Sequence, residues 1–314
     1  MIFRTSLAAA FAALLALASC RAPIDGPEVV VTIKPIHALV AGIMEGVGEP
    51  ALLMDGMVSP HAYQMRPSDA GFLAGASLVV WVAPSIEGAM PAALEMLPGE
   101  ARIVEVSTLE GLLLLPIRES GIRIGERDSD HQHTESLDSA WDAHVWLDPV
   151  NAIVITEAIA EELAAIDPPN AERYRQNSAR QVEQLAALDE ELRLALAPVR
   201  DVPFITFHDA FQYFEEAYGL TNVGSVAISP ERAAGGRTVM ELRELILSEG
   251  AVCVFAEPQF EPRLLNALTE GTVTRAGTLD PLGEEVFAGP DAYAQIMRNL
   301  ADAIVLGVHR ETGE

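Results

Sequence analysis

The sequence predicts an α/β protein of two lobes, each built on a sheet of mainly parallel strands and joined by one long rigid helix. Three observations carry this prediction. Short runs rich in β-branched residues recur along the chain, stretches with helical periodicity separate many of them, and one helical stretch is far longer than the others. Half of the 314 residues are hydrophobic, which is enough to fill one large core or two smaller ones.

The first residues predict an export signal. They carry an arginine near the amino end, then an apolar run from Leu7 to Ala18, and then Cys20. This run is shorter than the roughly 20 residues that cross a bilayer, so we expect a signal peptide over 1–20 and a periplasmic protein. The residues LASC resemble a bacterial lipobox, in which Cys20 is lipidated as the first mature residue. Ordinary cleavage nearby is the alternative.

Strand and helix patterns alternate after this signal. Buried strands are expected at 29–33, 77–82, 103–106, 204–207, 223–227, 252–256 and 273–278. Helices are expected at 37–45, 68–74, 209–218 and 239–248. Because strands that alternate with helices form parallel sheets, we expect two such sheets.

The longest predicted helix begins near Asn170, after a start signal with two prolines, and ends at Ala197. At 1.5 Å per residue it would span about 42 Å, which is longer than one small lobe needs. Its apolar residues recur every three or four positions and are Tyr174, Val182, Leu185, Leu188, Leu192 and Leu196. We therefore predict an N-terminal lobe at 26–168, a linking helix at 169–198 and a C-terminal lobe at 199–314, with little hinge motion.

Composition excludes one class of partner. The formal net charge is −26, and such a surface repels the phosphate backbone of a nucleic acid. The acidity favours solubility and adds a mild attraction for cations. Besides Cys20, the chain has only Cys253, which stands in an apolar run and is expected to be a buried, inert thiol. Contact with the membrane is expected only through a lipid anchor at Cys20.

The stretch 118–142 breaks the alternation, because it is polar, charged and rich in turn-forming residues. It holds His131 and His133 beside two aspartates. A solvated loop that happens to contain two histidines is one interpretation, and an arm that collects zinc weakly is the other. The sequence leaves both open.

Three histidines and one aspartate predict a metal site. They are His61 in SPHAY, His144 in DAHVWLDP, His208 in ITFHDA and Asp280 in TLDPLG. The last two follow predicted strands, and ligands of open α/β sheets gather at the carboxyl ends of strands. Three imidazoles and one carboxylate suit Zn2+ better than Mg2+ or Ca2+. Two ligands would come from each lobe, so the ion would lie at the interface between the lobes, which we call the seam.

The remaining histidines and motifs of the chain fit such a site less well. Judged by spacing alone, any single histidine is more often a structural residue than a metal ligand. His37 and His309 do not stand at the end of a predicted strand or loop, so we do not count them as ligands. Neutral imidazole needs a partner on its second nitrogen, and the candidates are Asp142, Asp148, Asp209 and Glu257. The chain has no HExxH helix, paired CxxC, GxSxG elbow or P-loop, which argues against the common hydrolase and nucleotide-binding chemistries.

Several long stretches carry a resemblance: VTIKPIHALV, SPHAYQMRPSDA, AHVWLDPVNA, FHDAFQYFEEAYGL, VFAEPQF and GTLDPLG. At these residues the chain resembles the periplasmic zinc-binding proteins of ABC importers, the ZnuA-like branch of the cluster 9 metal-binding proteins. The resemblance implies a metal at the lobe interface, with His61, His144, His208 and Asp280 as its ligands. Some zinc relatives have an acidic residue where this chain has Pro60, which leaves Asp280 or a water as the fourth ligand.

The resemblance implies a monomer that captures Zn2+ and delivers it to the permease of an ABC transporter, and it implies no enzymatic activity. A manganese or iron carrier of the same fold is the first rival interpretation. Related manganese binders place a carboxylate where His208 stands here, and the imidazole favours zinc. Two less favoured interpretations are a zinc hydrolase that uses the three histidines and a bound water, and an adhesin or structural lipoprotein that needs zinc only to fold.

Overall fold

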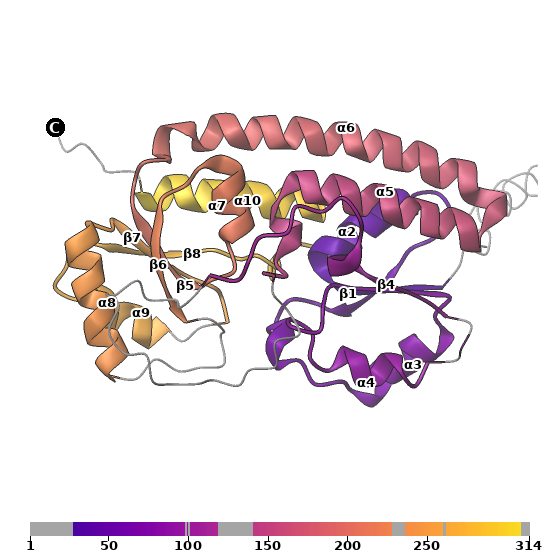
Figure 1. Ribbon diagram of the computed structural model, residues 1–314, viewed down its shortest axis with the longest axis horizontal. Helices are drawn as coiled ribbons and strands as arrows, with labels where there is room; N and C mark the ends of the chain where they lie inside the picture. Colours follow the sequence, from indigo (N-terminus) through magenta and orange to yellow (C-terminus); the bar gives the residue numbers. More distant parts are fainter. Residues whose placement is uncertain are drawn as a thin grey trace, which may run out of the picture.

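Two four-stranded parallel sheets lie side by side in the computed structural model, and one long helix, α6, runs along both of them (Figure 1). The structure describes residues 28–97, 99, 101–118, 141–227, 236–259 and 262–308. The predictions for the signal peptide at 1–20, for Cys20 and for His131, His133 and His309 lie outside these residues.

The first sheet has the strand order β2-β1-β3-β4. Its strands are β1 (Val29–Ile33), β2 (Ala51–Met54), β3 (Leu78–Trp81) and β4 (Arg102–Glu105). Its helices are α2 (Lys34–Ile43), α3 (Pro67–Gly75), α4 (Met90–Leu94) and α5 (Pro149–Ile166). Residues of β1 alternate between two apolar clusters, with Val29 and Val31 on one face and Val30 on the other. Both faces of the sheet are therefore covered, which explains why its central strands, β1 and β3, are almost entirely apolar.

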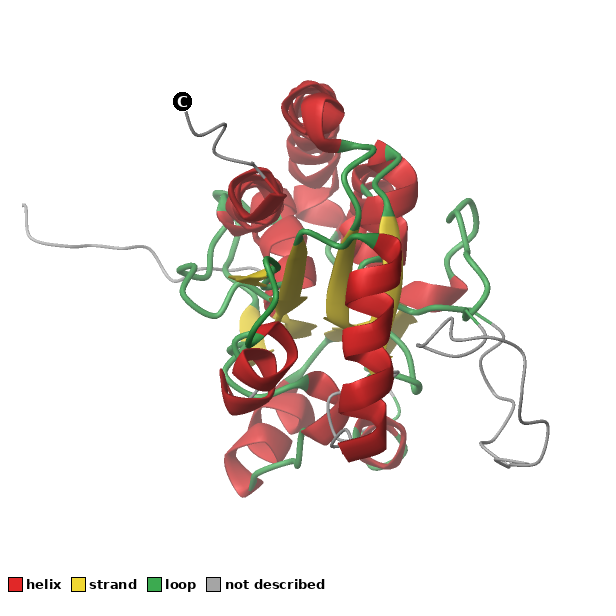
Figure 2. Cartoon of the chain, turned by 90° about the vertical axis from the view of Figure 1, so that its left-hand side faces the viewer, coloured by secondary structure: helices red, strands yellow, loops and turns green. Residues whose placement is uncertain are grey.

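The second sheet repeats this order as β6-β5-β7-β8. Its strands are β5 (Phe204–His208), β6 (Asn222–Ala227), β7 (Cys253–Ala256) and β8 (Arg275–Thr278). Its helices are α7 (Gln212–Tyr218), α8 (Gly236–Glu249), α9 (Pro262–Thr269) and α10 (Ala292–Val308). Viewed from this end of the molecule, helices lie on both sides of the strands (Figure 2). The two lobes thus share one architecture. In each, the second strand of the chain lies on one side of the first strand, and the third and fourth strands lie on the other side.

Helix α6 spans Ala171–Leu196, and its 26 residues correspond to a length of about 39 Å. It packs against α5 of the first lobe and α10 of the second. The buried residues of its apolar stripe include Leu185, Leu188 and Leu192, as the spacing predicts, whereas Val182 is only half-buried.

The main core does not stop at the seam. One continuous apolar cluster contains Val31 and Ile155 of the first lobe, Leu188 of α6, and Phe204 and Ile296 of the second lobe. Separating the lobes would expose part of this cluster to water, so the packing opposes a wide opening. The predicted fold class is confirmed, while the exact limits of the lobes remain a prediction.

Some elements differ from the sequence prediction. Strand β2 and helices α4, α5, α9 and α10 were not among the expected elements. The predicted strand at 273–278 is shorter and lies at an edge of the sheet, where Val273 just before it is 98% exposed. A buried strand was expected there, and that expectation was wrong, because β8 is largely exposed. None of the described helices combines the length and the apolar character that a membrane crossing requires.

Candidate metal centre

Three imidazoles that are far apart in the sequence meet at the seam between the lobes. His61 lies in a short 3-10 turn, Pro60–Ala62, His144 lies just before another, Val145–Leu147, and His208 is the last residue of β5. The ring centroids are 5.8 Å apart for His61 and His144, 5.4 Å for His61 and His208, and 5.1 Å for His144 and His208. One nitrogen of each ring lies within 4.8 Å of the others, which is a spacing that a single cation can bridge.

His208 is held by a carboxylate of the neighbouring strand. Its Nδ1 lies 2.6 Å from Oε1 of Glu257, which directly follows β7, and both residues are buried. Burial alone lowers the pKa of His208, but the carboxylate of Glu257 outweighs it, and the pKa is raised above its ordinary value. With Nδ1 engaged, Nε2 is the free ligand atom. It is buried and has no hydrogen-bond partner among the described residues.

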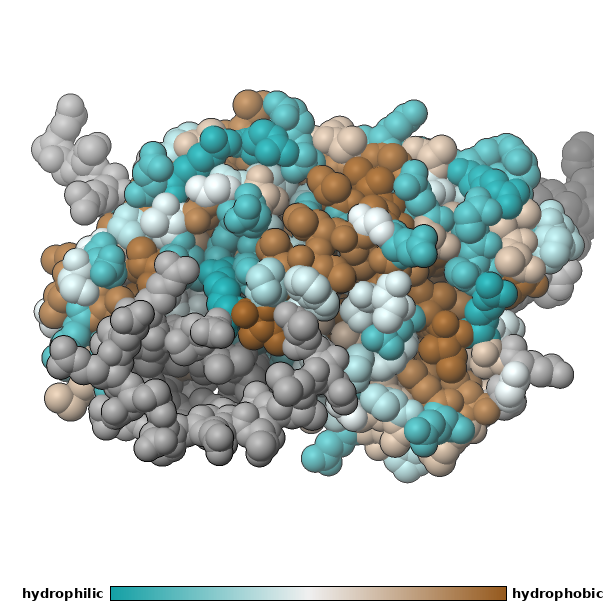
Figure 3. Space-filling view, viewed as in Figure 1, coloured by the Kyte–Doolittle hydropathy of each residue, from teal (hydrophilic) through white to brown (hydrophobic). Residues whose placement is uncertain are grey.

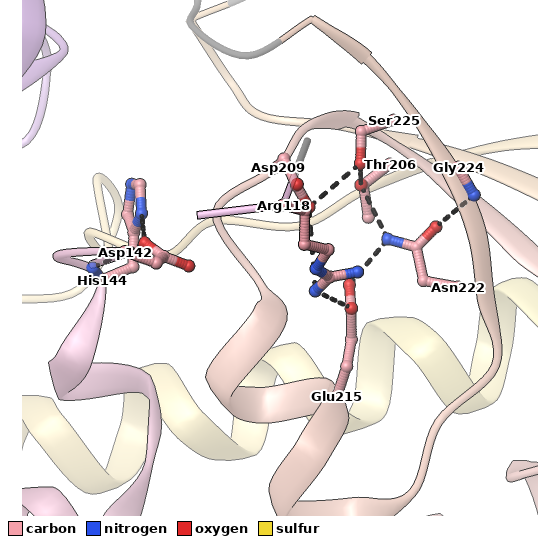
Figure 4. A network of polar contacts seen from close by, with 9 residues as sticks. All are labelled: Arg118, Asp142, His144, Thr206, Asp209, Glu215, Asn222, Gly224 and Ser225. Carbon is pink, nitrogen blue, oxygen red and sulfur yellow. Dashed lines mark hydrogen bonds and ion pairs between the residues drawn. The ribbon is translucent and has the colours of Figure 1, made fainter. Parts of the chain in front are cut away.

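His144 has the same arrangement on the other side of the seam. Oδ1 of Asp142 lies 2.7 Å from Nδ1 of His144 and also accepts the backbone N–H of His144 at 3.0 Å (Figure 4). The carboxylate therefore fixes both the main chain and the ring. A bond from Nδ1 to a carboxylate selects the tautomer that leaves Nε2 for a metal.

His61 is kept neutral by its surroundings. Burial, followed by the neighbouring rings of His144 and His208, lowers the pKa of His61 to about 3. Its ring donates a hydrogen bond to the backbone carbonyl of Ser85, while Nε2 is buried without a partner in the described part of the chain. An imidazole must be unprotonated to bind a metal, so His61 is ready to do so throughout the physiological pH range.

Asp280 lies at the seam, but its carboxylate is not in the group of three nitrogens. It accepts the backbone N–H groups of Leu282 at 3.1 Å, Gly283 at 2.8 Å and Glu284 at 2.5 Å. Lys34 of the first lobe holds the same turn, because its Nζ donates to the carbonyls of Gly283 and Glu284. Burial raises the pKa of Asp280, although these backbone bonds oppose the shift.

The remaining candidates have structural contacts. Asp148 caps α5 by accepting the N–H of Val150 at 2.8 Å, and His37 forms a hydrogen bond with the carbonyl of Pro50 at 2.9 Å. Cys253 is buried as predicted, and burial raises its pKa to about 12, so the thiol is inert at neutral pH.

A polar network borders the centre on the side of α7 (Figure 4). Arg118 of the first lobe reaches Glu215 in α7 at 2.5 Å and Asp209 at 3.7 Å. Asp209 also accepts a hydrogen bond from Ser225 at 3.2 Å, whereas Nδ1 of its neighbour His208 is bonded to Glu257. The sequence patterns did not single out Arg118 or Lys34. Their contacts with the other lobe become visible only in three dimensions.

Comparisons with known proteins agree with this geometry. The family model described as zinc-uptake complex component A, periplasmic, matches residues 29–307. A high-affinity zinc uptake system protein ZnuA from Brucella abortus is 38% identical over 300 residues, covering 88% of this chain and 90% of the relative. Among solved structures, a crystal structure of ZnuA has a TM-score of 0.76 at 22% identity and covers 91% of this chain and 100% of its own.

Another similar structure is the Zn(II)-bound ZnuA-like domain of Streptococcus pneumoniae AdcA, with a TM-score of 0.70 at 23% identity and coverage of 91% of this chain and 100% of that domain. These structural likenesses establish the two-lobed fold. The family model and the curated relative, which both extend over most of the chain, establish the family. The chain therefore belongs to the ZnuA family of periplasmic zinc-uptake components.

Proposed function

We propose that this chain captures Zn2+ outside the cytoplasm and delivers it to the membrane permease of an ABC transporter. His61, His144 and His208 are the proposed ligands. The observation that carries the proposal is the pair of buried Nε2 atoms on His61 and His208, neither of which has a hydrogen-bond partner among the residues that the structure describes. A buried polar atom without a partner is costly, and a bound cation would remove that cost at both atoms.

Zinc is the proposed ion because of the donor set. Three neutral nitrogen ligands with carboxylate or carbonyl groups behind them are typical of zinc sites, whereas manganese prefers more oxygen ligands. Relatives described as zinc uptake proteins support the same choice. Asp280 is proposed for the fourth position, with a water as the alternative, because it holds a turn that Lys34 of the other lobe also contacts. A manganese or iron carrier remains the second candidate.

The proposed mechanism is capture followed by triggered release. The shared core and α6 hold the ligands in place before the ion arrives, which reduces the entropy lost on binding. Release would occur when the permease distorts one lobe and weakens a ligand. A protein of this family binds and hands over its ion, so a zinc hydrolase with the same histidines is disfavoured.

We propose that the mature protein is a periplasmic monomer. Its export signal would lie within residues 1–20, with cleavage before Cys20, which would carry a lipid anchor as the first mature residue. The lobes are proposed to comprise 26–168 and 199–314, with 169–198 as the linking helix. A covalent anchor would keep the protein near its permease while leaving the fold in the aqueous phase.

Metal titration with elemental analysis tests the proposal. We expect wild type to hold one zinc per chain, His208→Ala to lose stoichiometric zinc, and Asp280→Ala to bind zinc more weakly or exchange it faster. His37→Gln is the matched control, because His37 is also buried but bonds to a carbonyl away from the group. Unchanged zinc binding by His208→Ala would overturn the proposed site.

A further inference from the structure

Two extended segments of the first lobe cross to the second lobe beside the metal centre. Pro116 forms an isolated antiparallel bridge with Trp141, and the N–H of Asp142 donates to the carbonyl of Leu115 at 2.9 Å. We call residues 113–118 and 141–144 together the strap. Its outer side chains include the half-exposed Leu113 and Trp141, and Figure 3 shows hydrophobic surface in the middle of this face.

One hydroxyl group of the second lobe holds both segments of the strap. Tyr213, in α7, is 1% exposed. Its hydroxyl donates to the carbonyl of Asp142 at 2.6 Å and accepts the N–H of Leu115 at 3.0 Å. Burial raises the pKa of Tyr213 to about 12, so the hydroxyl keeps the proton that it donates.

This contact connects two of the proposed ligands. Asp142 holds the ring of His144 through its carboxylate, and Tyr213 holds the main chain of Asp142. The helix that carries Tyr213 begins four residues after His208. A short chain of contacts therefore runs from His208 through α7 and the strap to His144, from one lobe to the other.

We propose that Tyr213 is a positioning residue for metal binding, which sets the spacing between His144 and His208 by fixing Asp142 across the seam. The inference rests on the proposed function of the three histidines. Arg118 and Glu215 attach the end of the strap to α7 but do not contact the backbone of Asp142. Among the described side chains, Tyr213 alone forms hydrogen bonds with both segments of the strap.

Tyr213→Phe tests this role, because it keeps the buried ring and removes only the hydroxyl. The backbone groups of Leu115 and Asp142 lose their common partner, so His144 gains freedom. Loss of an outer partner of a metal ligand typically weakens binding by 10–100-fold, and we expect about tenfold for this indirect contact. The matched control is Tyr174→Phe. Tyr174 is also buried, and its hydroxyl donates to Asp167 at 2.7 Å near the start of α6.

The readouts are zinc affinity by chelator competition and the visible absorption of bound Co2+, which reports ligand geometry. We expect both to change in Tyr213→Phe and neither to change in Tyr174→Phe. Unfolding of the zinc-free variants by urea checks that both are folded. Wild-type affinity and an unaltered Co2+ spectrum in folded Tyr213→Phe would refute the inference.

A double-mutant cycle identifies the route. If Tyr213 acts through Asp142, then Tyr213→Phe should have little further effect on zinc affinity in an Asp142→Asn background. It should keep its full effect in a Glu257→Gln background, because Glu257 holds His208 instead. Equal effects in both backgrounds would contradict the route. A wild-type protein that bound neither Zn2+ nor Co2+ would instead overturn the proposed function itself.

Discussion

Glu257→Gln should weaken zinc binding although Glu257 is not a proposed ligand. In the structure its carboxylate lies 2.6 Å from Nδ1 of His208, and the two residues are 6% and 2% exposed. A bound cation draws electrons from the ring and makes the Nδ1–H group a stronger donor, so this bond should be stronger in the loaded protein than in the free one. The glutamine oxygen still accepts the proton but carries no charge.

The size of the effect follows from the two kinds of hydrogen bond. A bond to a charged group contributes about 1.5–3 kcal/mol and a neutral bond about 1 kcal/mol. The difference of about 0.5–2 kcal/mol corresponds to roughly a 2- to 30-fold increase in the dissociation constant, because about 1.4 kcal/mol is tenfold. The effect should be largest near pH 8. At lower pH the raised pKa of wild-type His208 lets protons compete with zinc, and glutamine relieves that competition.

The assay is competition with a chelator of known zinc affinity at several pH values. Glu191→Gln is the matched control, because Glu191 is an exposed carboxylate in α6 that pairs with Arg298 at 2.7 Å, away from the three histidines. A dissociation constant for Glu257→Gln within twofold of wild type at pH 8 would show that the reasoning about His208 is wrong.

Two further predictions concern selectivity and pH. His208→Asp should shift the preference towards Mn2+, since it replaces nitrogen by oxygen, and competitive titration of Zn2+ against Mn2+ would show an unchanged ratio if this is incorrect. Burial raises the pKa of Glu87 to about 7, so between pH 4.5 and 7 its carboxyl ionises in the unfolded chain before it does so in the folded one. The free energy of unfolding of the wild type therefore falls by about 3 kcal/mol as the pH rises through this range. Glu87→Gln has no such group, so its stability relative to wild type should increase by about 3 kcal/mol from pH 4 to 8. Urea unfolding of the zinc-free proteins measures this gain, and a difference that stays constant with pH would argue against it.

The fold class could be predicted because the central strands are buried on both faces. Val29–Ile33 and Phe204–His208 are buried at every residue, and they are apolar apart from a threonine in each and the final histidine of the second. Such a run can be recognised in the sequence without knowing which strands lie beside it. Strand β2 has only four residues, three of them half-buried, so its pattern is weak. Helix α5 packs against both α2 and α6, so its apolar residues are spread over more than one side and its periodicity is weak.

The partners of the histidines needed the register of the strands. Asp209 is next to His208 in the chain, yet the carboxylate that holds His208 belongs to Glu257. In the parallel pairing of β5 with β7, Phe204 lies opposite Cys253, and continuing that register for four residues brings His208 opposite Glu257. No sequence pattern specifies which residues of two distant strands lie opposite each other. For the same reason, the role of Tyr213 was not visible in the sequence.

The placement of Trp146 gives the molecule a built-in optical probe. Its indole centroid is 5.3 Å from the ring of His144, it is 1% exposed, and its Nε1 donates to the carbonyl of Pro281 at 3.0 Å in the opposite lobe. A divalent charge arriving next to His144 would change the electric field at this indole and so the colour of its emission. Intrinsic fluorescence can therefore follow uptake and loss of the ion in real time, without any attached dye.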